Sequence, residues 1–163
     1  MKRFVGGVAT PDETSEHPGR AVDAVRRCRY MTSSAVSVLV VDDQTPFRAA
    51  ARAVIGRAAG FDLAGEAASG TEAIEMVAAL APSLVLMDIN MPGINGIEAT
   101  RRILADRPDA VVFLCSTYPL ADLPADAGTS GAVAYVNKEA LGPDLLRRLW
   151  DRRAEGRKEL LTG

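Results

Sequence analysis

Three aspartates lie at positions where an apolar run gives way to a polar loop. Asp42 and Asp43 follow the run VSVLVV, and Asp88 follows LVLM. Apolar runs of this length, bounded by turn residues, are typical of strands that are buried on both faces of a parallel sheet. The carboxyl ends of parallel strands meet at one edge, where ligands bind in open α/β sheets. We therefore expect the three carboxylates to lie together at that edge.

Carboxylates that lie close together repel one another unless a cation sits among them. Mg²⁺ suits such a site because it prefers oxygen ligands, keeps several waters and often takes a phosphate oxygen as a further ligand. An Asp pair after a strand can also form a turn or cap a helix. For Asp42 and Asp43 taken without the rest of the chain, that interpretation stays open.

Two further polar residues follow predicted strands. Ser116 ends the run AVVFLCS, and Lys138 is the second residue after AVAYV. Lys138 offers a compact positive charge to a phosphoryl oxygen, and Ser116 offers a hydroxyl donor. Asp88 could then attack phosphorus and form an aspartyl phosphate. A structural ion pair between Asp88 and Lys138 is the alternative. The coincidence of five polar positions at the ends of four strands favours the chemical interpretation.

Five predicted strands that alternate with helices must position these residues. The pattern indicates a doubly wound α/β fold with a parallel sheet, and we expect the flavodoxin-like strand order 2-1-3-4-5. Residues 118–131 contain two prolines and two glycines, so any helix there must be short or irregular. The predicted strands cover 36–41, 61–67, 84–88, 110–116 and 132–136, and the helices begin at Thr45, at Ser69 or Thr71, near Ile97 and at Pro143.

The remaining sequence indicates one globular domain after an N-terminal extension of different character. Apolar residues make up 48% of the 163 residues and charged residues 25%, as in soluble globular proteins. Residues 10–20 are polar and lack periodicity, which predicts that the extension 1–35 is disordered. We place the domain at 36–155 and a tail at 156–163. Translation that starts at Met31 is another explanation of the extension.

Charge and hydropathy argue against several classes of function. A formal net charge of −2 gives no general attraction to nucleic acid or acidic membranes. No apolar run approaches the roughly 20 residues of a membrane helix, and no secretory signal is evident, so we expect a cytoplasmic protein. Cys28 and Cys115 make no metal-binding pattern and are expected to be reduced thiols.

The segments VLVVDDQ, LVLMDINMPGINGIEA and YVNKEA together resemble the receiver domain of bacterial two-component response regulators. The resemblance covers about residues 36–155, and MDxxMPGxxG is its most specific part. It implies that Asp88 accepts a phosphoryl group from a phosphohistidine on a sensor histidine kinase or phosphotransfer protein. It also implies that Asp43, Asp88 and the backbone carbonyl of Asn90 bind Mg²⁺ directly, and Asp42 binds it through water.

The same resemblance implies a switch behind the phosphorylation site. Lys138 would contact the phosphoryl group, and Ser116, twenty-two residues before it, matches the family's switch Ser/Thr. Tyr135 matches the switch aromatic and is expected to turn inward from the surface when Ser116 moves. Tyr135 as merely a half-buried strand aromatic is the alternative. Thr117 is the alternative switch hydroxyl.

The favoured interpretation is a phosphorylation-switched signalling module with an unknown downstream protein partner, not a turnover enzyme. Phosphatases of the haloacid dehalogenase type also combine a nucleophilic Asp with Mg²⁺, Ser/Thr and Lys. They carry the nucleophile in a DxD pair on the first strand, whereas Asp88 is on the third, with Asn90 two residues later. A degenerate receiver that acts by binding alone stays open.

The residues after Lys138 suffice for one predicted helix. The chain therefore resembles a stand-alone receiver, from which we expect no direct nucleic-acid binding. The receiver fragment of a DNA-binding transcriptional regulator is the alternative.

Overall fold

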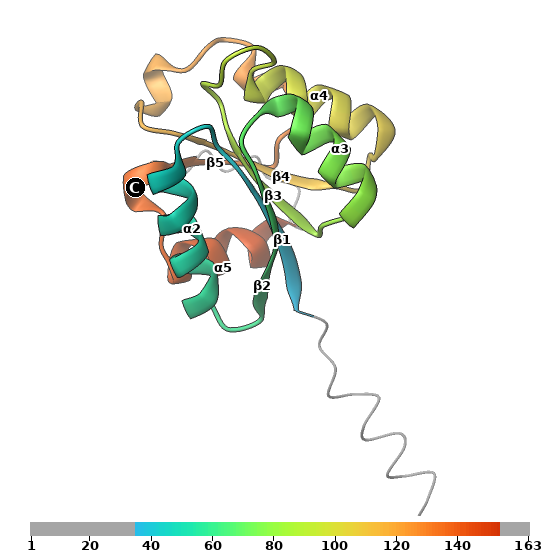
Figure 1. Ribbon diagram of the computed structural model, residues 1–163. Coiled ribbons are helices and arrows are strands. Elements are labelled where there is room, and N and C mark those ends of the chain that lie inside the picture. The colour runs from blue at the N-terminus through green and yellow to red at the C-terminus, as the bar shows by residue number, and fades with distance from the viewer. Residues whose placement is uncertain (1–34, 154–163) are drawn as a thin grey trace, which may run out of the picture. The chain divides into compact units, whose positions relative to one another are not determined.

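In the computed structural model, which describes residues 35–153 apart from the side chain of Leu120, the chain forms a five-stranded parallel sheet with helices on both faces (Figure 1). The hydrogen-bonded strand order is β2-β1-β3-β4-β5, which confirms the flavodoxin-like order predicted from the sequence. The predictions for the extension 1–35 and the tail 156–163 lie outside the described residues, except for residue 35. The strands are β1 (Val36–Val41), β2 (Phe61–Ala67), β3 (Leu84–Asp88), β4 (Val111–Ser116) and β5 (Ala134–Asn137).

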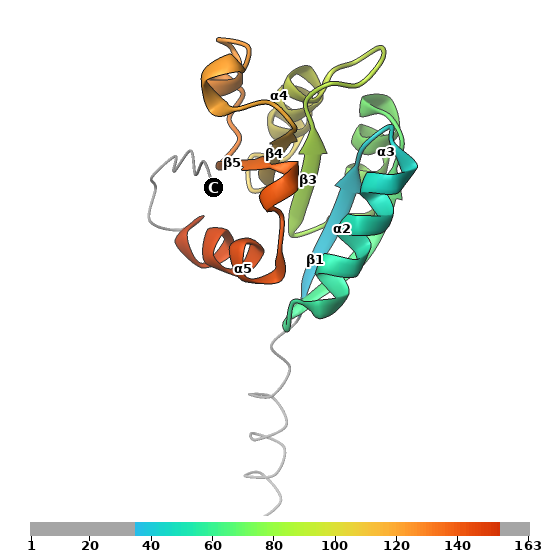
Figure 2. The ribbon, with the colours of Figure 1, turned by 90° about the vertical axis from the view of Figure 1, so that its left-hand side faces the viewer.

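Two helices cover each face of the sheet, as the two views in Figure 1 and Figure 2 show. The helices are α2 (Thr45–Arg57) and α5 (Pro143–Arg152) on one face, and α3 (Gly70–Leu80) and α4 (Gly96–Asp106) on the other. A proline lies in the first turn of α2 and of α5, where its missing N–H costs no hydrogen bond. Ser69 and Asn95 cap α3 and α4 with their side chains. Among residues 35–153, no helix has both the length and the apolar composition that a membrane span requires.

The strand side chains divide between two apolar clusters, one on each face. In β1, Val38 and Val40 lie with α2 and α5, whereas Leu39 and Val41 lie with α3 and α4. Every residue of β3 is buried, as expected for a central parallel strand. Burying one such Val or Leu side chain contributes about 1.5–3 kcal/mol, so the sheet firmly supports the residues at its carboxyl edge. Cys115 is a free thiol in this core, and Cys28 lies outside the described residues.

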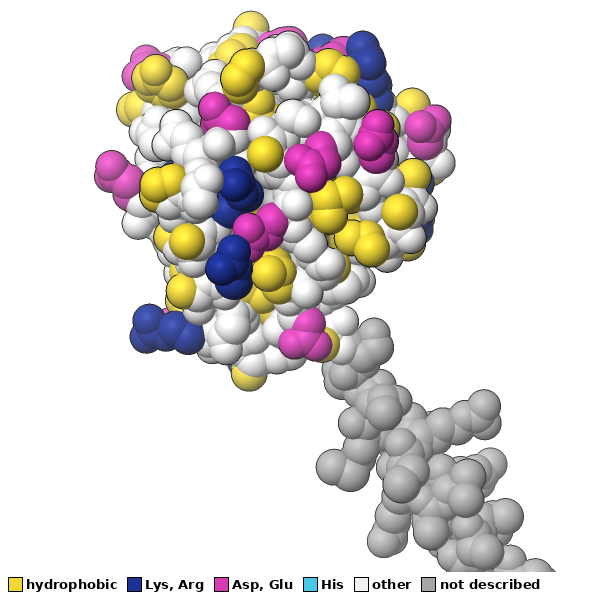
Figure 3. All heavy atoms as spheres, viewed as in Figure 1, with side chains coloured by type: hydrophobic (Ala, Val, Ile, Leu, Met, Phe, Trp, Pro, Cys, Tyr) yellow, Lys and Arg dark blue, Asp and Glu magenta, His cyan; other side chains and the backbone are white. Residues whose placement is uncertain are grey.

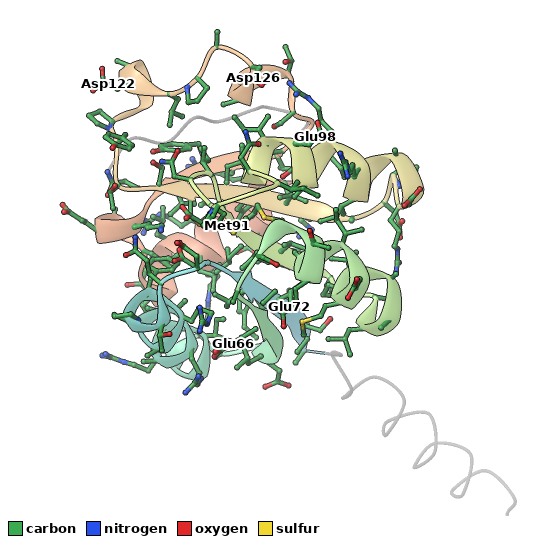
Figure 4. The ribbon with its side chains drawn as sticks, turned by 45° about the horizontal axis from the view of Figure 1, so that its top comes forward. Glu66, Glu72, Met91, Glu98, Asp122 and Asp126 are labelled. Atoms are coloured by element: carbon green, nitrogen blue, oxygen red, sulfur yellow. The ribbon has the colours of Figure 1, made fainter. Side chains whose placement is uncertain are left out.

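The connection between β4 and β5 contains only two short 3₁₀ turns, η1 (Leu120–Asp122) and η2 (Ala127–Thr129), which confirms the predicted irregularity. Arg101 of α4 pairs with the Asp126 carboxylate at 3.3 Å and also donates to its carbonyl. Asp126 and Asp122 mark this connection in Figure 4.

β5 begins two residues later than predicted and extends to Asn137. The chain is still turning before that point. Gly131 has a φ of 92°, and the N–H of Ala132 donates to the Ser130 hydroxyl.

Candidate functional site

The three predicted aspartates come together at the carboxyl edge of the sheet. Asp42 is 0% exposed and Asp88 2% exposed, whereas Asp43 is an exposed residue. One carboxylate oxygen of each lies within 4.8 Å of the others. The topology explains this convergence, because β1 and β3 are neighbours and Val41 pairs with Met87. The residues that follow these two therefore leave the sheet side by side.

Asp42 both forms a turn and faces the site. Its Oδ1 accepts a hydrogen bond from the Gln44 N–H at 2.8 Å, and its backbone carbonyl accepts one from the Arg48 guanidinium at 2.6 Å. Its own N–H donates to the Ala67 carbonyl. The turn-forming interpretation of the Asp pair is thus correct for Asp42 Oδ1. Its buried Oδ2 has no hydrogen-bond partner within this turn and faces the site.

Lys138 lies between two of the aspartates. Its Nζ is 2.5 Å from Asp42 Oδ2 and 3.0 Å from Asp88 Oδ1, and its side chain is 8% exposed. Burial acts to lower the pKa of Lys138, but the hydrogen bonds and charges of Asp42 and Asp88 raise it overall. The lysine is therefore positively charged at neutral pH, beside Asp88. This bridge is also the geometry that a purely structural ion pair would have.

The Asp88 carboxyl lies among more negative than positive side chains. Burial raises its pKa above the usual value, the Lys138 hydrogen bond and charge oppose that rise, and the Asp42 charge adds to it. One ammonium opposite three carboxylates leaves an excess of negative charge. A small divalent cation would offset this excess, and the donors are oxygens, which Mg²⁺ prefers. The residues of this edge therefore fit the predicted metal, and the acidic triad of Asp42, Asp43 and Asp88 could hold it.

The loop after Asp88 depends on one glycine. A Cβ at Gly96 would lie 1.9 Å from the Asp88 carbonyl oxygen, so any other residue would displace this loop. The Gly96 N–H donates to the Ile89 carbonyl at 3.0 Å, and Asn95 caps α4 at the same point. Met91 of this loop, 7% exposed, lies near the centre of Figure 4. This close approach gives a physical reason for the last glycine of the MDxxMPGxxG spacing.

Asn90 also belongs to this loop. Its backbone hydrogen bond to the Asp88 carboxyl acts to lower the pKa of that group. Ligation of a metal by the Asn90 carbonyl stays a prediction.

Ser116 and Thr117 lie in different environments. Ser116 is 0% exposed at the end of β4, and its backbone pairs with Asn137, the residue before Lys138. Thr117 is exposed. The Ser116 Oγ accepts a hydrogen bond from the Tyr118 N–H at 3.1 Å. The buried position behind the site is thus that of Ser116.

Tyr135 does not start at the surface, contrary to the expectation from the sequence. Its side chain is 2% exposed, because β5 pairs it with Leu114 on the face covered by α3 and α4. The hydroxyl donates to the Tyr118 carbonyl at 2.5 Å. Burial raises the pKa of this hydroxyl, and a hydrogen bond with Ser116 opposes the rise. The ring is therefore already turned inward and is more buried than a half-buried strand aromatic.

Three residues that contact this site were not predicted as part of it. The Phe47 ring lies against the Lys138 ammonium, and the Arg48 guanidinium donates a hydrogen bond to the Asp42 carbonyl. The backbone N–H and carbonyl of Tyr118 form hydrogen bonds with the side chains of Ser116 and Tyr135. Phe47 has the helical spacing of the apolar side chains of α2, so the sequence pattern indicates a core residue and gives no sign of its contact with Lys138. Its place in the first turn after the Asp pair is the signal that could have revealed it.

A protein family and several known proteins match this part of the chain. The family described as the response regulator receiver domain matches residues 38–149. The chain is 37% identical over 105 residues to the response regulator UvrY of Escherichia coli, covering 64% of this chain and 48% of that protein. It is 36% identical over 108 residues to the response regulator GacA of Pseudomonas aeruginosa, covering 64% and 49%. The chain thus spans about half the length of these curated relatives.

Two solved structures share the fold. The response regulator domain of Thermotoga maritima CheB has a TM-score of 0.66 at 29% identity, covering 74% of this chain and 97% of that chain. A LuxR-family two-component response regulator from Aurantimonas sp. has a TM-score of 0.68 at 30% identity, covering 77% and 89%.

Proposed function

Because the chain belongs over residues 38–149 to the response regulator receiver domain family, we propose that it is a phosphorylation-switched module of a two-component phosphorelay. Asp88 accepts the phosphoryl group of a phosphohistidine on a sensor histidine kinase or phosphotransfer protein. One observation carries the assignment. The Asp88 carboxylate lies 3.0 Å from the Lys138 ammonium and shares the sheet edge with Asp42 and Asp43.

The chain's own residues position the reacting groups. An Asp88 oxygen bonds to phosphorus while the phosphorus–nitrogen bond of the donor breaks, and the imidazole leaves with the electron pair. Burial of Asp88 limits its access to water, and Lys138 turns from the carboxylates to a phosphoryl oxygen. Positioning and charge neutralisation supply most of the rate enhancement in such transfers.

Mg²⁺ would supply the remaining positive charge. Asp43, Asp88 and the Asn90 carbonyl would hold it directly, and Asp42 would hold it through water. Self-phosphorylation by small donors and autodephosphorylation are the only chemical steps we assign to the chain, so it is not a turnover enzyme.

In this proposal, phosphorylation changes the packing of a surface of the domain and does not release a reaction product. Phosphorylated Asp88 carries about two negative charges, which attract the Ser116 hydroxyl. The hydrogen bond from the Tyr118 N–H to the Ser116 hydroxyl then breaks. Of the two hydrogen bonds that hold the backbone of Tyr118, at the start of segment 118–131, only the one from the Tyr135 hydroxyl remains. The face made by β5, α5 and this segment shifts between two packings that exist before phosphorylation.

We assign a downstream protein, and not nucleic acid, as the partner of this face. The formal net charge of −2 supports this assignment, because it gives no general attraction to nucleic acid. The side of the molecule drawn in Figure 3 carries both acidic and basic side chains. A cytoplasmic location follows from the proposed partners.

A degenerate receiver that acts by binding alone is the second candidate, because Lys138 already pairs with Asp42 and Asp88. Incubation with Mg²⁺ and acetyl phosphate separates the two. Intact-mass analysis should find one phosphoryl group on the wild type and none on Asp88→Asn. Asp62→Asn, at an exposed position of β2, should be labelled like the wild type. Equal labelling of wild type and Asp88→Asn would overturn the assignment of Asp88, and no labelling of either would favour the degenerate receiver.

A further inference from the structure

The first turn of α2 brings an aromatic ring against Lys138. The Lys138 Nζ lies 4.6 Å from the centroid of the Phe47 ring, a distance at which an ammonium is attracted by the negative face of the ring. Phe47 follows Pro46 at the start of the helix, and its N–H donates to the Gln44 carbonyl at 3.1 Å. The turn that follows Asp42 and Asp43 therefore also sets the position of the ring.

The groups around the Lys138 ammonium restrict its position. It has three N–H donors, and carboxylate oxygens of Asp42 and Asp88 lie 2.5 and 3.0 Å away. The Phe47 ring occupies a further side, and the lysine side chain is only 8% exposed. These contacts leave little room for water around the ammonium and keep it beside the Asp88 carboxylate.

We propose that Phe47 is a positioning residue for phosphoryl transfer. Its ring holds the Lys138 ammonium beside Asp88 and lets it reach a phosphoryl oxygen without competition from water. The inference rests on the proposed roles of Asp88 and Lys138, and it adds a residue that acts only through Lys138.

A purely structural role for the ring is the competing explanation. Phe47 is half-buried and packs against the apolar cluster between the sheet and helices α2 and α5. Phe61 belongs to the same cluster, where its ring packs against Trp150 with centroids 6.2 Å apart. Phe61 pairs with Val36 at the amino edge of the sheet, opposite the aspartates. Phe61→Leu is therefore a matched control for loss of a ring from this core.

The binding of beryllofluoride in Mg²⁺, measured by isothermal titration calorimetry, tests the proposal, because this phosphoryl analogue meets Lys138 only at Asp88. Phe47→Leu keeps an apolar side chain but removes the ring, and should weaken beryllofluoride binding by about 2- to 30-fold. Phe47→Tyr should bind it as the wild type does. Phe61→Leu should lower the unfolding midpoint in urea and leave beryllofluoride affinity unchanged. Mg²⁺ affinity should stay the same in all three variants.

A double-mutant cycle isolates the pathway through the lysine. In a Lys138→Gln background, Phe47→Leu should no longer slow the labelling of Asp88 by acetyl phosphate, because no ammonium is left for the ring to hold. An equal slowing in both backgrounds would overturn the proposal.

Wild-type affinity in Phe47→Leu would also overturn it and leave the proposed function intact. Absence of beryllofluoride binding at Asp88 in the wild type would overturn both. If Phe47→Leu does not fold, Phe47→Met, with a more adaptable apolar side chain, takes its place under the same criteria.

Discussion

The Tyr135 hydroxyl donates a hydrogen bond to the backbone carbonyl of Tyr118, seventeen residues earlier in the chain. The N–H of the same Tyr118 donates to Ser116, so both polar groups of this residue's backbone are bound by side chains at the end of β4 and in β5. The connection 118–131 has no regular helix to hold it. These two bonds therefore join the phosphorylation site to the proposed output face.

Tyr135→Phe removes one of these attachments and keeps the ring. We expect the free energy of unfolding to fall by about 1–3 kcal/mol, because the Tyr118 carbonyl loses its donor. Amide hydrogen exchange should speed up within 118–131. Tyr118→Phe is the control, since its side chain is 55% exposed and the bond uses only its backbone. Equal protection in wild type and Tyr135→Phe would contradict the expected attachment.

Ser116→Ala should uncouple phosphorylation from the output face. The variant keeps Asp88 and Lys138, so labelling by acetyl phosphate should continue. The NMR shifts that beryllofluoride causes at Tyr135 and along 141–153 should lose most of their amplitude, because no hydroxyl moves toward the phosphoryl analogue. Thr117→Ala, at an exposed position, should respond as the wild type does. Wild-type shifts in Ser116→Ala would transfer the switch role to Thr117.

Asp43→Ala should remove Mg²⁺ binding, since the change deletes a direct ligand of the proposed site. The loss should leave the fold intact because the side chain is exposed. Mg²⁺ titration followed by NMR measures the affinity. Asp62→Ala, another exposed aspartate at the amino end of β2, controls for the loss of one negative charge. If Asp43→Ala bound Mg²⁺ as tightly as Asp62→Ala, the assignment of Asp43 as a ligand would be wrong.

Asp88→Asn, compared with the wild type without Mg²⁺, measures the cost of the buried carboxylate. The pKa of Asp88 is raised in the folded protein, mainly by burial, so the folded state binds this proton more readily than the unfolded chain does. The stability of wild type relative to Asp88→Asn should therefore fall as the pH rises above about 4. The fall should end once the pH exceeds the raised pKa, where both states are ionised.

Urea unfolding of both proteins at a series of pH values gives this difference. Mg²⁺ at neutral pH should then stabilise the wild type more than Asp88→Asn, since the cation binds the ionised carboxylate. A difference in stability that does not change with pH would contradict the expected cost of ionisation.

The alternation of apolar runs, turns and helical spacing was enough to predict a parallel doubly wound sheet and the edge at which the aspartates meet. The flavodoxin-like order expected for such a sheet is the order observed. This works because carboxyl ends of parallel strands share an edge, so residues such as Asp42 and Asp88 converge whatever their side-chain conformations. The prolines and glycines of 118–131 likewise excluded a regular helix through local backbone chemistry.

Contacts between side chains from distant elements required the folded chain. Lys138 reaches both Asp42 and Asp88, Phe47 lies on the same ammonium, and Tyr135 is buried where an exposed ring was expected. Local patterns state which face of an element is apolar, but the partner of each side chain depends on how the elements pack. Packing of α2 against the sheet brought Phe47 to Lys138, and the pairing of β5 with β4 turned Tyr135 inward to the Tyr118 carbonyl.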